Sequence, residues 1–441
     1  MKWHAVGAVV LLVASLSAQG TDLMDVYLIA RGNDPTFEAA RLGFFAAQEK
    51  SPQALAANLP TLNLTGNSNH TDAKAAFNGS TPVRQGISAW TWTLQLTQPI
   101  MRPQNLLAYA ESEQLVEAAR ANFEQAEQDM ILRVAQAYFN VLIAQESVAT
   151  AEAQLRAMEE QGVVASRGYK SGTLSVTDVY EAKSKAELSR AQLLAAKNDL
   201  TVKHAELKQL TGRRMEQLAE LKPVAVIPIP APDNADDWVS QAQDNNPLVR
   251  AQLFSLRAAG YTVTKAQAGN LWTLDFVASS GSNYSSGNVT MPVGYESRIK
   301  SNVMGLQFTM PIFAGGLNRS QPREAVFNKN KLSAQLEEAR RKASADAEQA
   351  YAGILSGIAQ TEALRAAIES GESSVKGNQA GYKLGIRINS DVLNAQQQLY
   401  ASRRDLVKAR YDTLLQGLKL KAAAGVLNES DVEMINGMLV K

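Results

Sequence analysis

The sequence predicts a mainly α-helical protein that also carries membrane β-strands, and three observations lead to this fold class. The chain repeats itself over most of its 441 residues. Four short segments alternate apolar and polar side chains, as half-buried strands do. Two long stretches, residues 104–222 and 323–441, contain no proline and are rich in the residues that favour helices.

The internal repeat is visible in several matched motifs. Leu-Gln-Leu-Thr-Gln-Pro-Ile at 94–100 returns as Leu-Gln-Phe-Thr-Met-Pro-Ile at 306–312, an offset of 212 residues. Asn-Asp-Pro at 33–35 returns as Asn-Asn-Pro at 245–247 with the same offset. After one inserted residue, Tyr-Lys-Ser-Gly at 169–172 matches Tyr-Lys-Leu-Gly at 382–385. One structural unit is therefore present twice, as two similar halves of one body.

The repeat fixes the expected order of elements in each half: a short helix, two strands and a long helical hairpin. The first half covers 21–222, with strands at about 59–70 and 87–100 and a hairpin over 103–212. A proline-rich linker over 223–233 leads to the second half over 234–427, with strands at about 271–284 and 300–312 and a hairpin over 316–427. Residues 428–441 form a C-terminal segment.

The first twenty residues are typical of a secretory signal peptide, residues 1–20. An apolar run over 5–16 is followed by small residues, including Ala18 and Gly20, which predicts a mature start at Thr21. Cleavage after Ser17 is the second choice. A membrane anchor is less favoured, because the run is too short to span a bilayer.

The short helices are expected over residues 21–51 and 234–268, the second capped by Asp236 or Asp237. In the first long helix, apolar residues recur at spacings of three and four, which predicts a packed stripe. Its members are Ile131, Val134, Tyr138, Val141, Ala144 and Val148. Pro322 predicts that the second long helix begins late or kinks there.

Each long hairpin should turn at a glycine. Gly172 and Gly385 are expected to adopt the left-handed conformation that ends a helix. The returning helices then need N-caps. The candidates are Ser175 or Thr177 in the first half and Asn389 or Ser390 in the second.

The strands carry the membrane signal. Trp90, Trp92, Leu94 and Leu96 alternate with threonine and glutamine, and the other three segments alternate in the same way. One apolar and one polar face fit a transmembrane barrel, although a single segment fits a soluble sandwich equally well. Four strands cannot close a barrel, so neighbouring copies must share it, and strand counting leaves their number open.

With these features in place, the chain resembles the TolC-like outer-membrane channels of Gram-negative bacteria, which serve type I secretion and multidrug efflux. The resemblance covers about residues 21–436. The motifs that carry it are Leu-Pro-Thr-Leu-Asn-Leu at 59–64, the repeated strand motif at 94–100, Met-Pro-Ile-Phe-Ala-Gly-Gly at 310–316, Tyr-Lys-Ser-Gly-Thr at 169–173, and Tyr-Lys-Leu-Gly-Ile-Arg at 382–387 followed by Asp-Val-Leu at 391–393.

The resemblance implies a homotrimer with a twelve-stranded β-barrel in the outer membrane, continued by a twelve-helix α-barrel in the periplasm. It also implies a periplasmic adaptor (membrane fusion) protein and an inner-membrane ABC or proton-driven pump as partners. By the same resemblance, residues 428–441 are expected to form a C-terminal equatorial segment. The expected function is a passive exit duct, and the alternative is a soluble periplasmic coiled-coil scaffold or adaptor.

The resemblance also implies a periplasmic gate at Thr177, Asp178, Tyr382 and Arg387, with acidic rings at positions matching Asp391 and Asn394. Asparagine at 394 departs from the two-acid pattern, so we expect weaker trapping of cations. Asp391 and Asp178 have a second interpretation, in which both only cap a returning helix.

Two further groups of residues are predicted. By analogy with the family, the adaptor contact comprises Gly172, Thr173, Leu174, Ser175, Gly385 and Ile386, the alternative being an ordinary helix turn. Trp90 and Trp92 fit an aromatic belt at the membrane interface, or packing between strand and loop.

The composition argues against other classes of function. With 44 basic and 43 acidic residues, no broad positive field favours nucleic acid. The chain has no cysteine, and its three histidines lack metal-ligand spacing. No phosphate loop or nucleophile motif is present, so we expect no enzyme activity, cofactor or metal.

Overall fold

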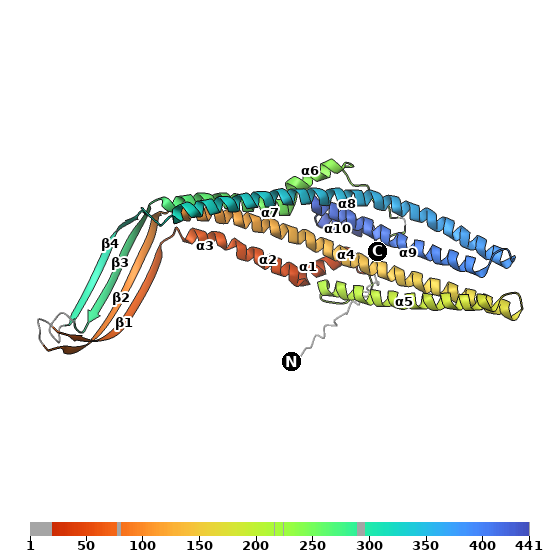
Figure 1. Ribbon diagram of the computed structural model, residues 1–441, viewed down its shortest axis with the longest axis horizontal. Coiled ribbons are helices and arrows are strands. Elements are labelled where there is room, and N and C mark those ends of the chain that lie inside the picture. Colours follow the sequence, from red (N-terminus) through yellow and green to blue (C-terminus); the bar gives the residue numbers. More distant parts are fainter. Residues whose placement is uncertain (1–19, 77–80, 216, 224, 289–295, 441) are drawn as a thin grey trace, which may run out of the picture. The chain divides into compact units, whose positions relative to one another are not determined.

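The computed structural model describes residues 20–76, 81–215, 217–223, 225–288 and 296–440 (Figure 1). The chain forms two compact units. The first comprises Met1–Arg41, Glu124–Pro247 and Arg340–Lys441, and the second comprises Leu42–Phe123 and Leu248–Ala339. The predicted signal peptide, residues 1–20, falls outside the described residues except for Gly20. Among the described helices, none combines the length and the apolar character that a membrane-crossing helix needs.

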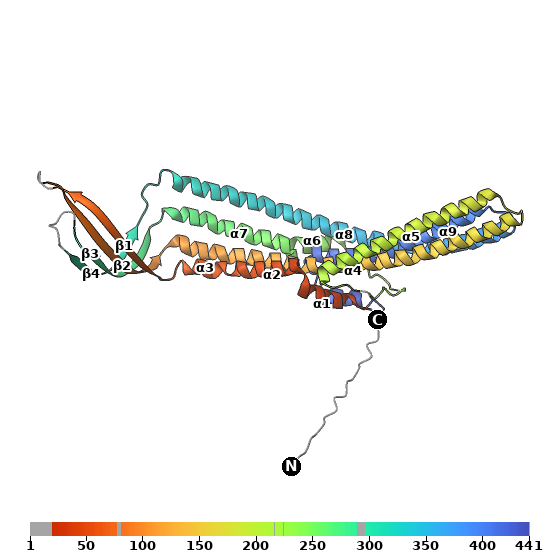
Figure 2. The same cartoon turned by 90° about the horizontal axis from the view of Figure 1, so that it is seen from below.

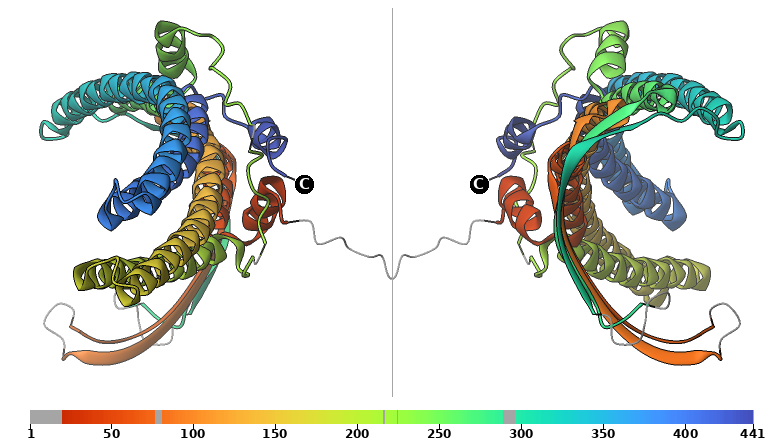
Figure 3. Two further views of the ribbon diagram at one scale, coloured as in Figure 1. Left: turned by 90° about the vertical axis from the view of Figure 1, so that its right-hand side faces the viewer. Right: turned by 90° about the vertical axis from the view of Figure 1, so that its left-hand side faces the viewer.

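The second unit contains the β-sheet. Its described strands are β1 (Thr61–Ala75), β2 (Val83–Met101), β3 (Thr273–Ser285) and β4 (Ser297–Thr309), which pair antiparallel in the order β1-β2-β3-β4. The sheet is visibly curved (Figure 3). No described residue pairs with the outer edge of β1 or of β4. β1, β2 and β4 each continue further toward the connecting loops than the apolar alternation predicts, because backbone pairing extends to Ala75–Val83 and to Ser285–Ser297.

One face of this sheet is apolar and uncovered within the chain. Leu64 on β1, Leu94 on β2 and Leu306 on β4 are 71%, 37% and 66% exposed. On β3 the polar residues Asp275 and Ser282 are buried, one on each face of the sheet. So many exposed large apolar side chains indicate a surface that faces something other than water.

An ion pair anchors the end of β2 to β3. The Arg102 guanidinium donates from Nε and Nη2 to the two carboxylate oxygens of Asp275, both at 2.7 Å. Asp275 is 6% exposed. A two-pronged contact of this kind is the strong form of an arginine–carboxylate pair, because both hydrogen bonds are charge-assisted and their geometry is fixed.

The helices follow the predicted long-hairpin pattern. The first hairpin is α4 (Pro103–Lys170) with α5 (Val176–Thr211), and the second is α8 (Leu317–Lys383) with α9 (Asn389–Ala423). In the first unit, α4 and α5 lie side by side toward their turn (Figure 2). Of the predicted stripe on α4, every member is buried except Val148, which is half-buried. Pro322 is the sixth residue of α8, so that helix does not begin late, and a kink at this residue stays a prediction.

The short helices differ from the prediction. The first is three helices, α1 (Leu23–Asn33), α2 (Pro35–Gln48) and α3 (Lys50–Ala56). The second is α6 (Ala235–Asn245) and α7 (Pro247–Gln267), followed by the short 3-10 helix η1 (Ala268–Asn270). Pro35 and Pro247 cause the corresponding breaks, because proline lacks an amide proton and restricts the residue before it. Asn234 caps α6, rather than Asp236 or Asp237, by accepting from the amide of Asp236 at 3.2 Å.

The remaining elements of the first unit surround the middle of α4. Thr21 pairs with Leu218, and Leu221 pairs with Leu439 beyond the last helix, α10 (Glu429–Asn436). The buried hydroxyl of Tyr138 donates to the carbonyl oxygen of Ala219 at 2.7 Å. These contacts bring both ends of the described chain and the segment between the repeats into one core.

Candidate gate at the helix tips

Both hairpin turns have the same backbone conformation. Gly172 and Gly385 have φ angles of 74° and 75°, in the left-handed region that favours glycine, so the predicted helix ends are confirmed. The amide of Thr173 donates back to Gly168, and the amide of Ile386 donates back to Gly381, each at 2.9 Å. These bonds use carbonyl oxygens that the end of a helix would otherwise leave unpaired.

The acid of the first tip, Asp178, serves as a helix cap. Its Oδ2 accepts from the amide of Ser175 at 3.1 Å, while the hydroxyl of Ser175 accepts from the amide of Thr177 at 3.1 Å. Ser175 is therefore the N-cap, as one of the two predicted choices. The capping interpretation of Asp178 is confirmed, and it leaves Oδ1 of the same carboxylate available to a partner.

The second tip is capped differently. α9 begins at Asn389, and the preceding residue, Ile388, makes no side-chain cap, so the prediction of Asn389 or Ser390 as N-cap is wrong. Asn389 is instead 1% exposed, and its Oδ1 accepts from Nε2 of Gln161 on α4 at 2.6 Å. Its Nδ2 lies 3.5 Å from the carbonyl oxygen of Asp178. This side chain therefore joins the second repeat to both helices of the first hairpin.

Arg387 is held close to its own turn. A Cβ atom placed on Gly381 would lie 2.7 Å from Cγ of Arg387, so the arginine stem crosses the space that a larger residue would fill. The Arg387 guanidinium lies 3.7 Å from the carboxylate of Asp391, one turn further along α9. With 59% and 35% of their side chains exposed, this pair is only weakly stabilising.

Tyr382 lies near Asp178 without a hydrogen bond to it. The hydroxyl of Tyr382 is buried and has no hydrogen-bond partner among the described residues. Burial raises the pKa of this hydroxyl, and the Asp178 carboxylate raises it further. The Tyr382 hydroxyl is therefore within the electrostatic influence of Asp178, and no hydrogen bond joins them among the described residues.

Asn394 has a lysine as its neighbour. Nζ of Lys185 on α5 lies 3.4 Å from Oδ1 of Asn394 and 3.1 Å from Oε1 of Gln397. Sequence reasoning missed this lysine, because the two positions are 209 residues apart. The buried side chains of Met158, Ala182 and Leu393 form one apolar core between the first hairpin and α9.

The predicted adaptor residues are mostly at the surface. Gly172, Thr173, Ser175, Gly385 and Ile386 are exposed, whereas Leu174 is half-buried and packs against the apolar core of the tip. Two exposed residues that the prediction omitted, Leu384 and Ile388, flank Ile386 with 74% and 64% exposure. The alternation of apolar residues at 384, 386 and 388 was the available signal. The second tip thus presents an apolar edge.

Trp90 and Trp92 lie on β2 in the second unit, 38% and 40% exposed. The ring of Trp90 stacks on Tyr284 of β3 at 5.8 Å between centroids. Both the interface position and packing are compatible with this arrangement. The described residues contain no group of three or more metal-binding side chains.

Comparison with known proteins places the chain in one family. The family described as "Outer membrane efflux protein" matches residues 26–213 and again 238–426. "Outer membrane protein TolC" of Escherichia coli (strain K12) is 32% identical over 435 residues, covering 97% of this chain and 87% of that protein. "Alkaline protease secretion protein AprF" of Pseudomonas aeruginosa is 28% identical over 442 residues, covering 99% and 90%.

Solved structures share the fold. The Campylobacter jejuni CmeC outer membrane channel aligns with a TM-score of 0.79 at 18% identity, covering 95% of this chain and 90% of that one. The outer-membrane channel OprN aligns with a TM-score of 0.78 at 16% identity, covering 91% and 89%. Four strands per chain and two repeats of helical hairpins are thereby confirmed as a TolC-like fold.

Family membership decides between the two functional hypotheses. A soluble periplasmic scaffold is wrong, because the family consists of outer-membrane channels that are not enzymes and that extend into the periplasm. Family membership also implies trimeric assembly, and the other two copies supply the strands that the open sheet requires. With its two matched repeats and its exposed apolar strands, this chain belongs to the outer membrane efflux protein family and is an outer-membrane channel for efflux or type I secretion.

Proposed function

We propose that this channel receives its cargo from an inner-membrane ABC or proton-driven pump, through a periplasmic adaptor that docks on the helix tips. The observation that carries this proposal is the apolar edge of the second tip, formed by Leu384, Ile386 and Ile388. Exposed apolar residues grouped beside a turn are typical of a protein-binding surface. The energy for transport comes from the partner, since the sequence has no nucleotide-binding motif.

The same tips form the gate. Asp391 and Arg387 lie one helical turn apart, and Asp178 and Tyr382 lie close to each other. Around the axis of a trimer, like charges at Asp391 from three copies repel by roughly 1 to 4 kcal/mol per pair at about 4 Å. Arg387 offsets that repulsion, so the closed state depends on an arginine, a tyrosine and two acids. Thr177 and Asn394 complete the ring of polar residues.

The absence of cysteine allows a direct test of docking. Ile386→Cys would be labelled with a photo-crosslinker in otherwise cysteine-free protein, and cells would be irradiated. We expect one crosslinked periplasmic protein with a membrane anchor. Val226→Cys, at 77% exposure against 75% for Ile386, is the matched control. Equal capture at the two sites, or none at Ile386, would refute docking at the tips.

The cargo is tested separately. Deleting the chain and comparing secreted proteins with drug sensitivity separates protein secretion from small-molecule efflux. Loss of particular secreted proteins with unchanged drug sensitivity assigns secretion, and the reverse assigns efflux. If neither changed, the transport role itself would be refuted.

A further inference from the structure

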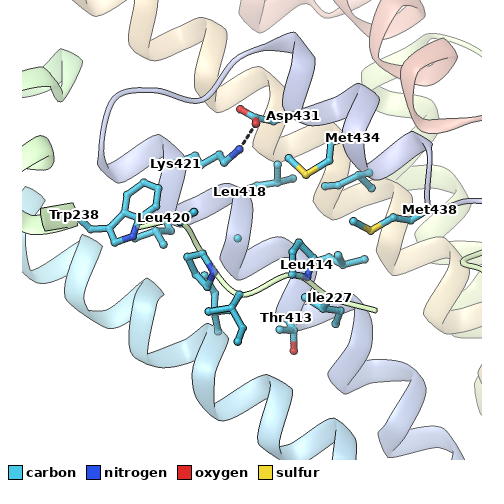
Figure 4. A pocket seen from close by; sticks show the side chains of 17 residues that line it. Ile227, Trp238, Thr413, Leu414, Leu418, Leu420, Lys421, Asp431, Met434 and Met438 are labelled. Atoms are coloured by element: carbon cyan, nitrogen blue, oxygen red, sulfur yellow. Dashed lines mark hydrogen bonds and ion pairs between the residues drawn. The ribbon is translucent and has the colours of Figure 1, made fainter. Parts of the chain in front are cut away.

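The first unit contains an apolar cavity of about 290 Å³ (Figure 4). Its walls come from four places in the sequence: the proline-rich linker, α6, α8, and α9 together with α10 and Met438, two residues beyond that helix. Trp238, Leu418, Met434 and Ile435 are among the apolar side chains that line it. The cavity lies away from both helix tips in sequence, and the proposed gate uses none of its residues.

The linker wall is unusual in its chemistry. Residues 227–231 alternate isoleucine and proline and end in alanine. Proline has no amide proton, so this wall offers few backbone donors to water. Ile229 is 57% exposed, so this part of the linker wall also faces solvent.

One charged pair meets this apolar surface. Lys421 at the end of α9 is hydrogen-bonded to Asp431 on α10, and both line the cavity (Figure 4). The Asp431 side chain is 5% exposed and the Lys421 side chain 32%. A mostly apolar pocket with one converging polar group is typical of small-molecule sites.

The hydrogen bonds of the pair favour an anion. Asp431 already accepts from Lys421 with Oδ1 and from the amide of Asn428 at 3.0 Å with Oδ2, so both carboxylate oxygens are used. An ammonium group has three donors, and Asp431 accepts one of those of Lys421. Lys421 can therefore donate to a second acceptor, and the hydrogen bond is strongest when that acceptor is an anion.

The volume limits the size of the apolar part. A cavity of roughly 150 Å³ lined by apolar residues holds one benzene ring. The cavity here is about twice as large, so it suits about twelve non-hydrogen atoms. Met434 and Met438 line it, and methionine side chains adapt to a flexible chain better than branched ones do.

We propose that this cavity binds a medium-chain carboxylate, with the hydrocarbon chain among the apolar residues and the carboxylate on Lys421. This site is independent of the proposed gate and of docking at the tips.

The test uses Trp238 as a reporter inside the cavity. The probe is ω-bromodecanoate, whose bromine quenches tryptophan fluorescence at short range, added to purified trimer in nanodiscs. Trp238→Phe measures the quenching that comes from tryptophans elsewhere, and the difference between the two proteins isolates the cavity. We expect saturable quenching that Trp238→Phe lacks. Linear, unsaturable quenching in both proteins would overturn the proposal.

The head group is tested with two matched probes and one variant. In wild type, ω-bromodecanoate should bind roughly tenfold more tightly than ω-bromodecanol, and more tightly than ω-bromodecylamine. The double variant Lys421→Gln/Asp431→Asn keeps a neutral hydrogen-bonded pair and should abolish this preference. Equal affinity for all three probes in wild type, or an unchanged preference in the double variant, would overturn the assignment of a carboxylate ligand.

A bromine position supplies independent evidence. Crystals of the trimer with ω-bromodecanoate should show an anomalous peak among Trp238, Leu418 and Met434. Ile229→Trp, which adds bulk from the exposed linker, should remove the peak. A peak only on the outer surface of the linker would contradict binding in the cavity.

Discussion

Nε2 of Gln161 donates to Oδ1 of Asn389 at 2.6 Å in a buried contact between the two repeats. The corresponding residues of the opposite repeats, Ser374 and Val176, are exposed and make no such contact within the described residues. The contact is therefore asymmetric. It ties α9 to the first hairpin and has no counterpart on the other side, so it distinguishes two hairpins that share one turn geometry.

Asn389→Ala should loosen the second tip. The change leaves the buried amide of Gln161 without its partner, which costs roughly 1 to 3 kcal/mol. We expect a lower temperature of trimer dissociation and a higher single-channel conductance in planar bilayers. Val176→Ala, at the corresponding position of the first repeat, should change neither. The double variant Gln161→Leu/Asn389→Leu should be close to wild type in stability, because apolar groups then replace both partners. A double variant worse than either single one would contradict this explanation.

Gly381→Ala should displace Arg387, since the new Cβ atom would lie 2.7 Å from Cγ of the arginine. We expect the conductance of the resting channel to rise, although alanine favours a helix over glycine by about 1 kcal/mol. Gly377→Ala, one turn earlier, is the matched control, because a Cβ there meets no atom within 4 Å. It should stabilise the helix and leave conductance unchanged. Equal conductance in the two variants would mean that the position of Arg387 does not matter.

Arg387→Ser should weaken the closed state, because Asp391 loses the positive charge 3.7 Å away. The direct loss in one chain is small, roughly 0 to 1 kcal/mol, and repulsion between copies adds to it. The measurement is single-channel conductance, which should increase. Arg404→Ser removes another exposed arginine, also 3.7 Å from an aspartate, and serves as control. Unchanged conductance in Arg387→Ser would count against a gate role.

Asn394→Asp alone should restore little cation trapping. Nζ of Lys185 lies 3.4 Å from this side chain and would neutralise a new carboxylate. Asn394→Asp together with Lys185→Gln should increase block by multivalent cations by about tenfold or more, since in each chain one negative charge is added and one positive charge is removed. The readout is the cation concentration for half-block, with Lys185→Gln alone as control. Strong block by Asn394→Asp alone would show that Lys185 does not screen this position.

The first unit should lose stability in alkali. Burial raises the pKa of Tyr411 from 10.0 to about 12. The unfolded chain then releases this proton at a lower pH than the folded one. The stabilisation that this tyrosine contributes is therefore complete below pH 10 and is lost as the pH rises toward about 12. Two pKa units correspond to roughly 2 to 3 kcal/mol. Tyr411→Phe should flatten the curve of unfolding temperature against pH, whereas Tyr180→Phe, which removes an exposed tyrosine, should not. Parallel curves for all three proteins would contradict this assignment.

The repeat, the four strands and the long hairpins could be predicted because each leaves a local trace. Leu64, Leu94 and Leu306 alternate with polar residues, and proline is absent where the helices are long. The break at Pro35 was available from the sequence as well, because the Asn-Asp-Pro motif ends a helix by the same rule. Its counterpart at Pro247 follows from the repeat.

The tip contacts could not be predicted in the same way. Gln161 and Asn389 are 228 residues apart, and nothing near either residue identifies its partner. A polar residue at the start of a helix is usually a cap, and here tertiary packing overrides that preference. Asp178 shows the opposite case: its capping role is entirely local, through Ser175 three residues earlier, and sequence reasoning found it.

Within the part of the chain that the structure describes, no strand pairs with the outer edges of β1 and β4, so each copy needs its neighbours to complete the sheet. A variant with an intact helical unit but a damaged strand edge would still assemble with normal copies. Each trimer that contains it would then lack a complete sheet. Where both are made in equal amounts, only about one trimer in eight would contain wild-type chains alone. Such a strand mutation would therefore behave as dominant in a cell that also carries the normal gene.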